Sequence, residues 1–164
     1  MAEIVQIQDK RRTFVDTLDK LAETDKNIVV IIPDVGFNYL SSKHNFPIVN
    51  TGVTEAFATI FAATLALDGW RPYLYSMINF VLFRPAEMVR NGIVCHKAPV
   101  TLIGVKGSTS YKFLGFSHNL LHDKEDFNFC DNISLKWHNP QNNEEVATAV
   151  VESYQSNEPR YIRL

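Results

Sequence analysis

The chain has 164 residues, of which 46% are hydrophobic and 21% are charged, and its formal net charge is −2. This length and composition predict one globular domain, and the balanced charge gives no reason to expect nucleic acid or an anionic membrane surface as a partner. No apolar run approaches the roughly 20 residues of a membrane-spanning helix, and residues 1–10 lack the pattern of a secretory signal peptide, so we expect a cytoplasmic protein.

Helical and strand patterns alternate along the chain. Residues 27–32 form a β-branched run, which is typical of a central parallel strand covered on both faces. Asp34 follows this run and is expected at the carboxyl end of the strand. An Ala-rich helix over about 53–68 has apolar or small residues on every side and is expected to be buried. In chain order, the predicted elements are a helix over 11–23, a strand over 27–32, a loop over 37–50, the helix over about 53–68, a strand over 71–76, a helix over 83–95 with Pro85 in its first turn, a strand over 99–105, a loop over 106–123, a strand over 133–137, a helix over 142–154 and a strand over 160–164.

Strands that alternate with helices predict a three-layer α/β/α fold with a mainly parallel sheet. Ligands of such proteins gather at the carboxyl ends of the strands. Asp34, the turn before Glu55, residues 76–84 and the loop over 106–123 would all meet at this edge.

Taken one at a time, the candidate site residues carry limited information. Glu55 stands in the first turn of the Ala-rich helix, where an acid more often complements the helix dipole. Phe80 alone is a core aromatic by default, whereas His118, in a polar loop after a buried strand, is a candidate site residue. The chain has no GxGxxG, P-loop or GxSxG motif. His118 and His122 are four residues apart, but they lie among loop-forming residues, so we do not expect a metal-binding pair on a helix there. Cys95 and Cys130 lack metal or redox spacing and are expected to be buried thiols.

Several stretches together resemble a known family. They are Gly52-Val53-Thr54-Glu55 with the small-residue helix that ends at Asp68-Gly69-Trp70, the aromatic segment over 76–87, Gly115-Phe116-Ser117-His118-Asn119 with Glu125-Asp126 after it, and the closing Glu158-Pro159-Arg160-Tyr161-Ile162-Arg163-Leu164. Their order and spacing resemble the pyrimidine-binding (Pyr) domain of thiamine-diphosphate enzymes, in particular the transketolase and deoxyxylulose-phosphate-synthase branch. The resemblance implies a single Pyr domain over 1–164, with neither the pyrophosphate-binding (PP) domain nor the C-terminal domain of a full-length transketolase.

The resemblance implies roles in cofactor binding for four residues. Glu55 would hydrogen-bond N1′ of the aminopyrimidine of thiamine diphosphate, which favours the 4′-imino form that activates the cofactor. Phe80 would stack on the pyrimidine ring, with Phe83 as the competing position. Asp34 would lie near the thiazolium side.

The resemblance also implies residues on the substrate side. His118 would act as an acid, a base or a hydrogen-bond donor over the reacting centre. Arg84 would help to position an anionic substrate group, and Asn119 would contact the substrate. Leu114 stands where members with sugar-phosphate substrates usually have an acid, and Asn119 stands where they have a glutamine. The resemblance therefore does not imply ordinary transketolase specificity.

The resemblance further implies a partner. In this family the diphosphate and Mg²⁺ are bound by a G-D-G…N motif on a PP domain, and the chain's one Asp-Gly pair, Asp68-Gly69, lacks that context. We therefore expect a Pyr subunit that is active only in a hetero-oligomer, of α2β2 type, with a PP subunit that carries Mg²⁺. No metal ligand is expected in this chain.

The expected reaction is transfer of a two-carbon ketol or acyl unit between small carbonyl or sugar substrates. One alternative is an E1β-like or other 2-oxo-acid decarboxylase subunit, although E1β chains carry a further C-terminal domain. A second alternative is a Pyr-like scaffold without catalytic function.

Overall fold

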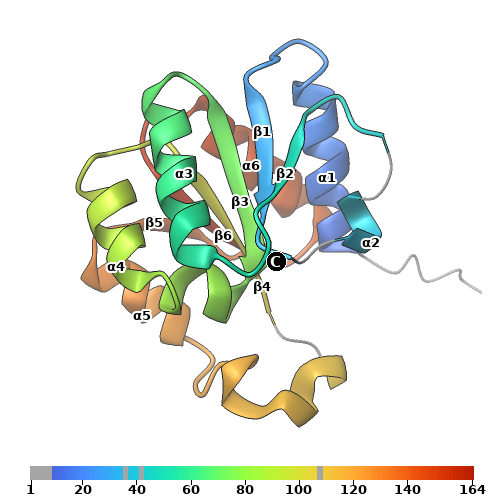
Figure 1. Cartoon of the computed structure of the whole chain (residues 1–164). Coiled ribbons are helices and arrows are strands. Elements are labelled where there is room, and N and C mark those ends of the chain that lie inside the picture. The colour runs from blue at the N-terminus through green and yellow to red at the C-terminus, as the bar shows by residue number, and fades with distance from the viewer. Residues whose placement is uncertain (1–8, 35–36, 41–42, 107–108) are drawn as a thin grey trace, which may run out of the picture.

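A parallel sheet forms the centre of the molecule in a computed structural model that describes residues 9–34, 37–40, 43–106 and 109–164. The strand order within these residues is β2-β1-β3-β4-β6-β5, and every neighbouring pair is parallel (Figure 1). This confirms the predicted parallel α/β fold. The strands are β1 (Ile28–Ile32), β2 (Ile48–Asn50), β3 (Arg71–Met77), β4 (Thr101–Val105), β5 (Lys136–His138) and β6 (Arg160–Arg163).

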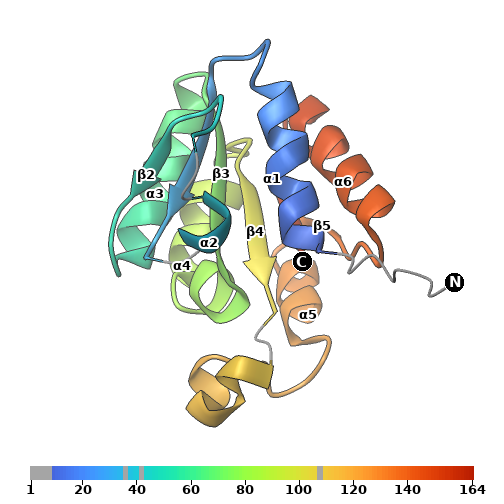
Figure 2. The same ribbon diagram turned by 90° about the vertical axis from the view of Figure 1, so that its right-hand side faces the viewer.

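Helices cover both faces of this sheet, which gives three layers (Figures 1 and 2). Because successive side chains of a strand point to opposite faces, β1 contributes to two cores: Val29 and Ile31 to one, and its remaining three residues to the other. The first core is covered by α3 (Glu55–Leu67), η1 (Asn79–Phe83), η2 (Val89–Val94) and α5 (Glu125–Asn132), and α4 (Ala86–Met88) lies between η1 and η2. The second is covered by α1 (Lys10–Leu21) and α6 (Asn143–Gln155).

Three stretches hold elements that the sequence did not predict. The expected loop over 106–123 contains the 3-10 helix η3 (Thr109–Ser117). The expected loop over 37–50 contains the short helix α2 (Phe37–Leu40) and strand β2, which pairs with β1 through Val30 and Ile48. Helix α5 fills residues for which no element was predicted, between the segment 106–123 and β5. A strand of three residues and a helix of two turns are too short for a clear periodic signal.

The predicted helix over 83–95 begins earlier and is not a regular α-helix. It starts with the π-helical turn η1, in which Arg84 N donates to Asn79 O at 2.9 Å, and Pro85 stands between η1 and α4, at the N-cap of α4. Proline has no N–H to donate and its ring clashes with the carbonyl four residues before it, so Pro85 separates the two helical turns. The π-turn brings Phe80 and Arg84 onto the same side.

Helix α3 is buried on one face only, so the prediction that it is buried on every side was wrong. Its inner face carries small residues such as Ala58 and Ala62, which are fully buried and let the helix lie close to the sheet. Its outer face carries Phe57, Ile60 and Leu67, which are 60%, 43% and 59% exposed. An apolar outer face of this kind is typical of an interaction surface.

The two cysteines differ in environment. Cys130 is buried in the first core, and burial raises the pKa of its thiol, which makes it unreactive. Cys95, at the end of η2, is exposed, so the prediction of a buried thiol was wrong there. Within the described residues, none of the helices has the length and apolar character needed to cross a bilayer.

Candidate functional site

Glu55 is held at the carboxyl edge of the sheet by a tight turn after β2. Gly52 has φ +69°, the left-handed region that glycine adopts without strain, and its N–H donates to Asn50 Oδ1 at 2.9 Å. Thr54 Oγ1 donates to Thr51 O at 2.9 Å, and α3 begins at the next residue. Glu55 is only 5% exposed, so its carboxylate lies largely out of water.

The Glu55 carboxylate contacts an arginine that also lies over an aromatic ring. Arg84 Nη1 donates to Glu55 Oε1 at 2.5 Å, and the guanidinium carbon lies 4.1 Å from the centre of the Phe80 ring. The Arg84 side chain is 45% exposed and that of Glu55 is 6% exposed. Three residues predicted from the sequence therefore form one cluster of carboxylate, planar cation and aromatic ring.

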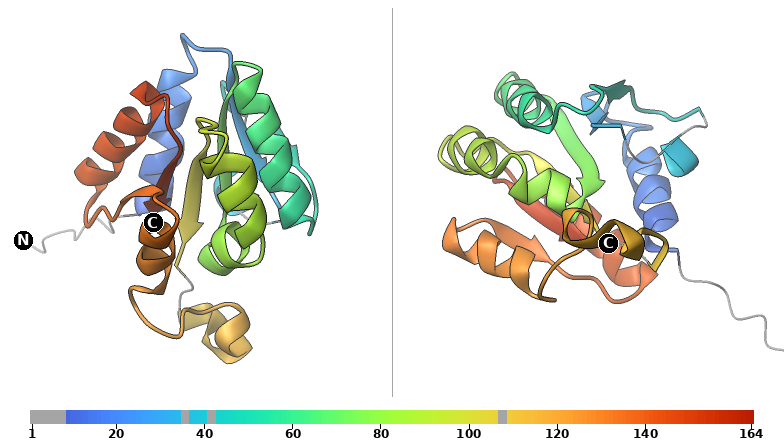
Figure 3. Two further views of the ribbon diagram at one scale, coloured as in Figure 1. Left: turned by 90° about the vertical axis from the view of Figure 1, so that its left-hand side faces the viewer. Right: turned by 60° about the horizontal axis from the view of Figure 1, so that its bottom comes forward.

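His118 joins this cluster through Phe80. The two rings meet edge to face with centres 5.0 Å apart, and Tyr111 lies parallel to the His118 ring at 6.1 Å. Ser117 Oγ lies 2.8 Å from His118 Nδ1. These residues belong to η3 (Thr109–Ser117) and the residue after it, in a segment that projects beyond the carboxyl edge of the sheet (Figures 2 and 3).

Two asparagines tie this segment to the rest of the molecule and to itself. Asn79 Nδ2 donates to Phe116 O at 3.0 Å. Asn119 Nδ2 donates to Tyr111 O at 3.0 Å and Gly115 O at 2.8 Å. The sequence analysis missed Asn79 and Tyr111, because their contacts depend on how the segment folds back and no local pattern signals them.

The other two candidates for cofactor binding lie apart from these contacts. Phe83 packs edge to face on Phe129 at 5.7 Å, on the side of the first core. Asp34 is exposed just after β1 with φ +63°, at the predicted edge of the sheet. Of the two competing aromatic residues, Phe80 is the one whose ring lies against the guanidinium of Arg84, the residue that pairs with Glu55.

Charged residues join the two ends of the segment that carries His118. Asp123 accepts from Lys106 Nζ at 2.6 Å and from Arg163 Nη2 at 2.8 Å, and these two hydrogen bonds hold the pKa of its carboxyl below the ordinary value. Fully buried Asp126 accepts from Tyr161 Oη at 2.8 Å, and burial, followed by the charge of Asp126, raises the pKa of that phenol. A Cβ at Gly104 would lie 2.5 Å from Tyr161 Oη, so this position leaves room only for glycine.

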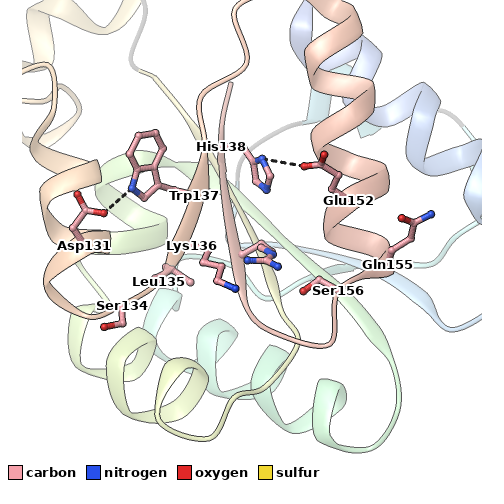
Figure 4. A pocket seen from close by; sticks show the side chains of 10 residues that line it. Asp131, Ser134, Leu135, Lys136, Trp137, His138, Glu152, Gln155 and Ser156 are labelled. Atoms are coloured by element: carbon pink, nitrogen blue, oxygen red, sulfur yellow. Dashed lines mark hydrogen bonds and ion pairs between the residues drawn. The ribbon is translucent and has the colours of Figure 1, made fainter.

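A cavity of about 790 Å³ lies elsewhere, beside β5 and the end of α6, at the edge of the sheet opposite to β2 (Figure 4). Four side chains that line it pair with one another: His138 Nδ1 lies 3.6 Å from Glu152 Oε2, and Trp137 Nε1 donates to Asp131 Oδ1 at 2.8 Å. Burial lowers the pKa of His138. We assign no function to this cavity. Among the described residues no three His, Cys, Asp or Glu side chains gather in a way that would hold a metal ion.

Comparisons with known sequences agree with the resemblance. The family described as "Transketolase, pyrimidine binding domain" matches residues 8–164. The chain is 31% identical over 117 residues to a subunit of apulose-4-phosphate transketolase from Phocaeicola vulgatus, a match that covers 69% of this chain and 38% of the relative. It is 34% identical over 93 residues to 1-deoxy-D-xylulose-5-phosphate synthase of Nitratidesulfovibrio vulgaris, a match that covers 54% of this chain and 14% of the relative. The chain thus spans well under half of the length of these relatives.

Solved structures share the fold. A split gene transketolase, described as an inactive β4 tetramer, matches with a TM-score of 0.76 and 22% identity, over 94% of this chain and 50% of that chain. Transketolase from Campylobacter jejuni matches with a TM-score of 0.80 and 14% identity, over 95% of this chain and 25% of that chain. Because the family match extends over residues 8–164, nearly the whole chain, we conclude that this chain belongs to the transketolase pyrimidine-binding domain family.

Proposed function

We propose that this chain is the Pyr subunit of a two-subunit, thiamine-diphosphate-dependent enzyme of transketolase type. In this proposal Glu55 activates the cofactor for transfer of a two-carbon ketol or acyl unit between carbonyl substrates. The whole proposal depends most on one observation: a carboxylate that is 5% exposed contacts a planar cation lying over the Phe80 ring.

The chemistry of this cluster fits an aminopyrimidine. Such a ring is planar, can carry a proton at N1′ and needs an aromatic face beneath it and an acid at its edge. Phe80 offers the face and Glu55 offers the acid. The guanidinium of Arg84, a planar group with N–H donors, supports this fit, because it lies over Phe80 and donates to the Glu55 carboxylate. Bound thiamine diphosphate would supply the carbanion chemistry at carbonyl carbons.

Each candidate site residue then has a defined role. Glu55 holds a proton at N1′, in a setting where little water competes for that hydrogen bond. Phe80 orients the ring. We prefer Phe80 to Phe83 for this role because Phe80 lies beside the contact between Arg84 and Glu55. His118, in contact with Phe80, serves as the acid, base or hydrogen-bond donor toward the substrate. We further propose that Arg84 and Asn119 contact the substrate, and that Asp34 lies near the thiazolium.

A partner completes the site in this proposal. The relative from Phocaeicola vulgatus is named as one subunit of a transketolase, which supports a second subunit. The apolar outer face of α3 supports an interface beside Glu55. A PP-type subunit would bind the diphosphate through Mg²⁺, in an α2β2 assembly.

The test uses the chain assembled with a PP-type partner, thiamine diphosphate and Mg²⁺. Because the substrates are undefined, the measurement is exchange of the C2 proton of the cofactor for deuterium, followed by NMR. We expect Glu55→Gln to slow this exchange by about 10²-fold or more, since an amide cannot hold a proton at N1′ in the same way. Glu87→Gln, which changes an exposed acid on α4, is the matched control and should exchange at the wild-type rate.

Wild-type exchange in the Glu55→Gln assembly would rule out cofactor activation by this residue. The chain would then be a scaffold for its partner. Transfer itself is tested next, with an α-keto donor and an aldehyde acceptor, by detection of the new ketol product.

A further inference from the structure

Arg84 occupies the place that the proposed function reserves for the pyrimidine ring. Its guanidinium carbon lies 4.1 Å from the centre of the Phe80 ring, and its Nη1 donates to Glu55 Oε1 at 2.5 Å. A ring that stacked on Phe80 and bonded to Glu55 would need the same face and the same carboxylate. The guanidinium and the ring therefore compete.

The two groups have matching chemistry. A guanidinium is planar and delocalised, stacks on aromatic faces and presents paired N–H donors to a carboxylate. An aminopyrimidine protonated at N1′ is also a planar cation with N–H donors at its edge. Glu55 and Phe80 thus select one kind of ligand, and a side chain of the chain itself satisfies that selection.

The side chain of Arg84 is free to leave its contact with Glu55, whereas Glu55 is held in place. The Arg84 side chain is 45% exposed, so water already solvates much of its charge and can solvate the guanidinium fully once it leaves. Arg84 also follows the π-turn η1 and precedes Pro85, so its backbone is positioned while its long side chain can rotate away. Glu55, at 6% side-chain exposure, stays in place.

We propose that Arg84 is an intramolecular ligand that closes the pyrimidine site of the free chain and leaves it when the cofactor binds. This inference rests on the proposed cofactor site. A site that is open only part of the time binds its ligand more weakly, in proportion to the open fraction. After release, the Arg84 guanidinium is available for the anionic substrate group proposed above, so one residue would serve in two states.

The experiment measures binding of 4-amino-5-hydroxymethyl-2-methylpyrimidine, the pyrimidine half of thiamine, to the free chain by ligand-observed NMR. We expect Arg84→Ala to bind this probe about tenfold more tightly than the wild type, because the competing guanidinium is gone and the site is always open. Arg84→Lys keeps the charge but loses the planar group, and should bind with intermediate affinity. Urea unfolding of each variant establishes that it is folded.

Two controls locate the effect. Arg90→Ala removes an exposed arginine of η2, whose Nη1 bonds to neighbouring Asn91, and should bind the probe as weakly as the wild type does. Glu55→Gln added to Arg84→Ala should abolish the gain. A gain that persists in this double variant would put the probe elsewhere and overturn the inference.

Equal or weaker binding by Arg84→Ala would also overturn it, since Arg84 would then be absent from the site or would help to hold the ring. Failure of every chain to bind the probe has the same consequence. None of these outcomes decides the proposed function, which depends on C2 proton exchange in the assembly with the partner.

Discussion

Asp126 is a carboxylate with no exposed surface, and the residues around it explain how the chain tolerates a buried charge. Tyr161 Oη donates to it at 2.8 Å, and Arg163 Nη1 lies 3.4 Å from its other oxygen. Arg163 is itself 5% exposed and also holds Asp123. A buried carboxylate is stable only when opposite charge and hydrogen bonds replace its lost hydration.

Replacing Arg163 with Met should therefore destabilise the chain by roughly 2–4 kcal/mol, because it leaves the Asp126 charge buried with only the phenol as a partner. Urea unfolding followed by circular dichroism measures this loss. Lys136→Ala is the control: its ion pair with Glu158 is exposed on both sides, and its removal should not change the unfolding midpoint. Equal effects of the two substitutions would contradict this account of Arg163.

At the scale of an element, α3 has two faces with different tasks. Ala58, Ala62 and Ala66 press against the sheet, while Phe57, Ile60 and Leu67 point outward. The sequence of this helix is apolar all round, so periodicity predicted complete burial. A single chain has no second layer to cover the outer face, which is why the prediction was wrong for those three residues.

Substitutions on the two faces of α3 should affect different properties, assembly on the outer face and stability on the inner face. Phe57→Ser should change the free energy of unfolding by less than about 0.5 kcal/mol, since the side chain is 60% exposed, yet weaken assembly with the PP partner. Ala62→Leu should destabilise the chain by about 1–3 kcal/mol, because it overfills a closely packed contact. Urea unfolding and sedimentation velocity separate the two effects. Unchanged assembly of the Phe57→Ser variant would move the interface away from α3.

For the molecule as a whole, the turn after β2, η1 and the segment after β4 all lie at the carboxyl edge of the sheet. Parallel strands bring their ends to one edge, so residues as distant in sequence as Glu55 and His118 come near the same ring, Phe80. This edge offers contacts for the pyrimidine end of the cofactor, and in our proposal the diphosphate end belongs to the partner.

The chain by itself should accordingly bind thiamine diphosphate and Mg²⁺ weakly. Calorimetric titration of the free chain is expected to give little heat, and the same titration after addition of a PP-type partner should show tight binding. The protein concentration and buffer are kept equal in both, so the partner is the single difference. Tight binding without the partner would refute the divided site.

The sequence alone determined the parallel α/β fold, because strand composition and helix periodicity are local signals. The resemblance of its ordered motifs to the Pyr family, rather than any one local pattern, singled out Glu55, Phe80, Arg84 and His118. The tertiary structure decided how these residues meet. The contact of Arg84 with both Glu55 and Phe80 depends on the π-turn before Arg84 and on the approach of α3, and it joins Glu55 to a residue 29 positions later in the chain. The hydrogen bond from Asn79 to Phe116 O likewise depends on how the segment after β4 folds back. Such contacts arise from packing between elements, and no local pattern in the sequence encodes them.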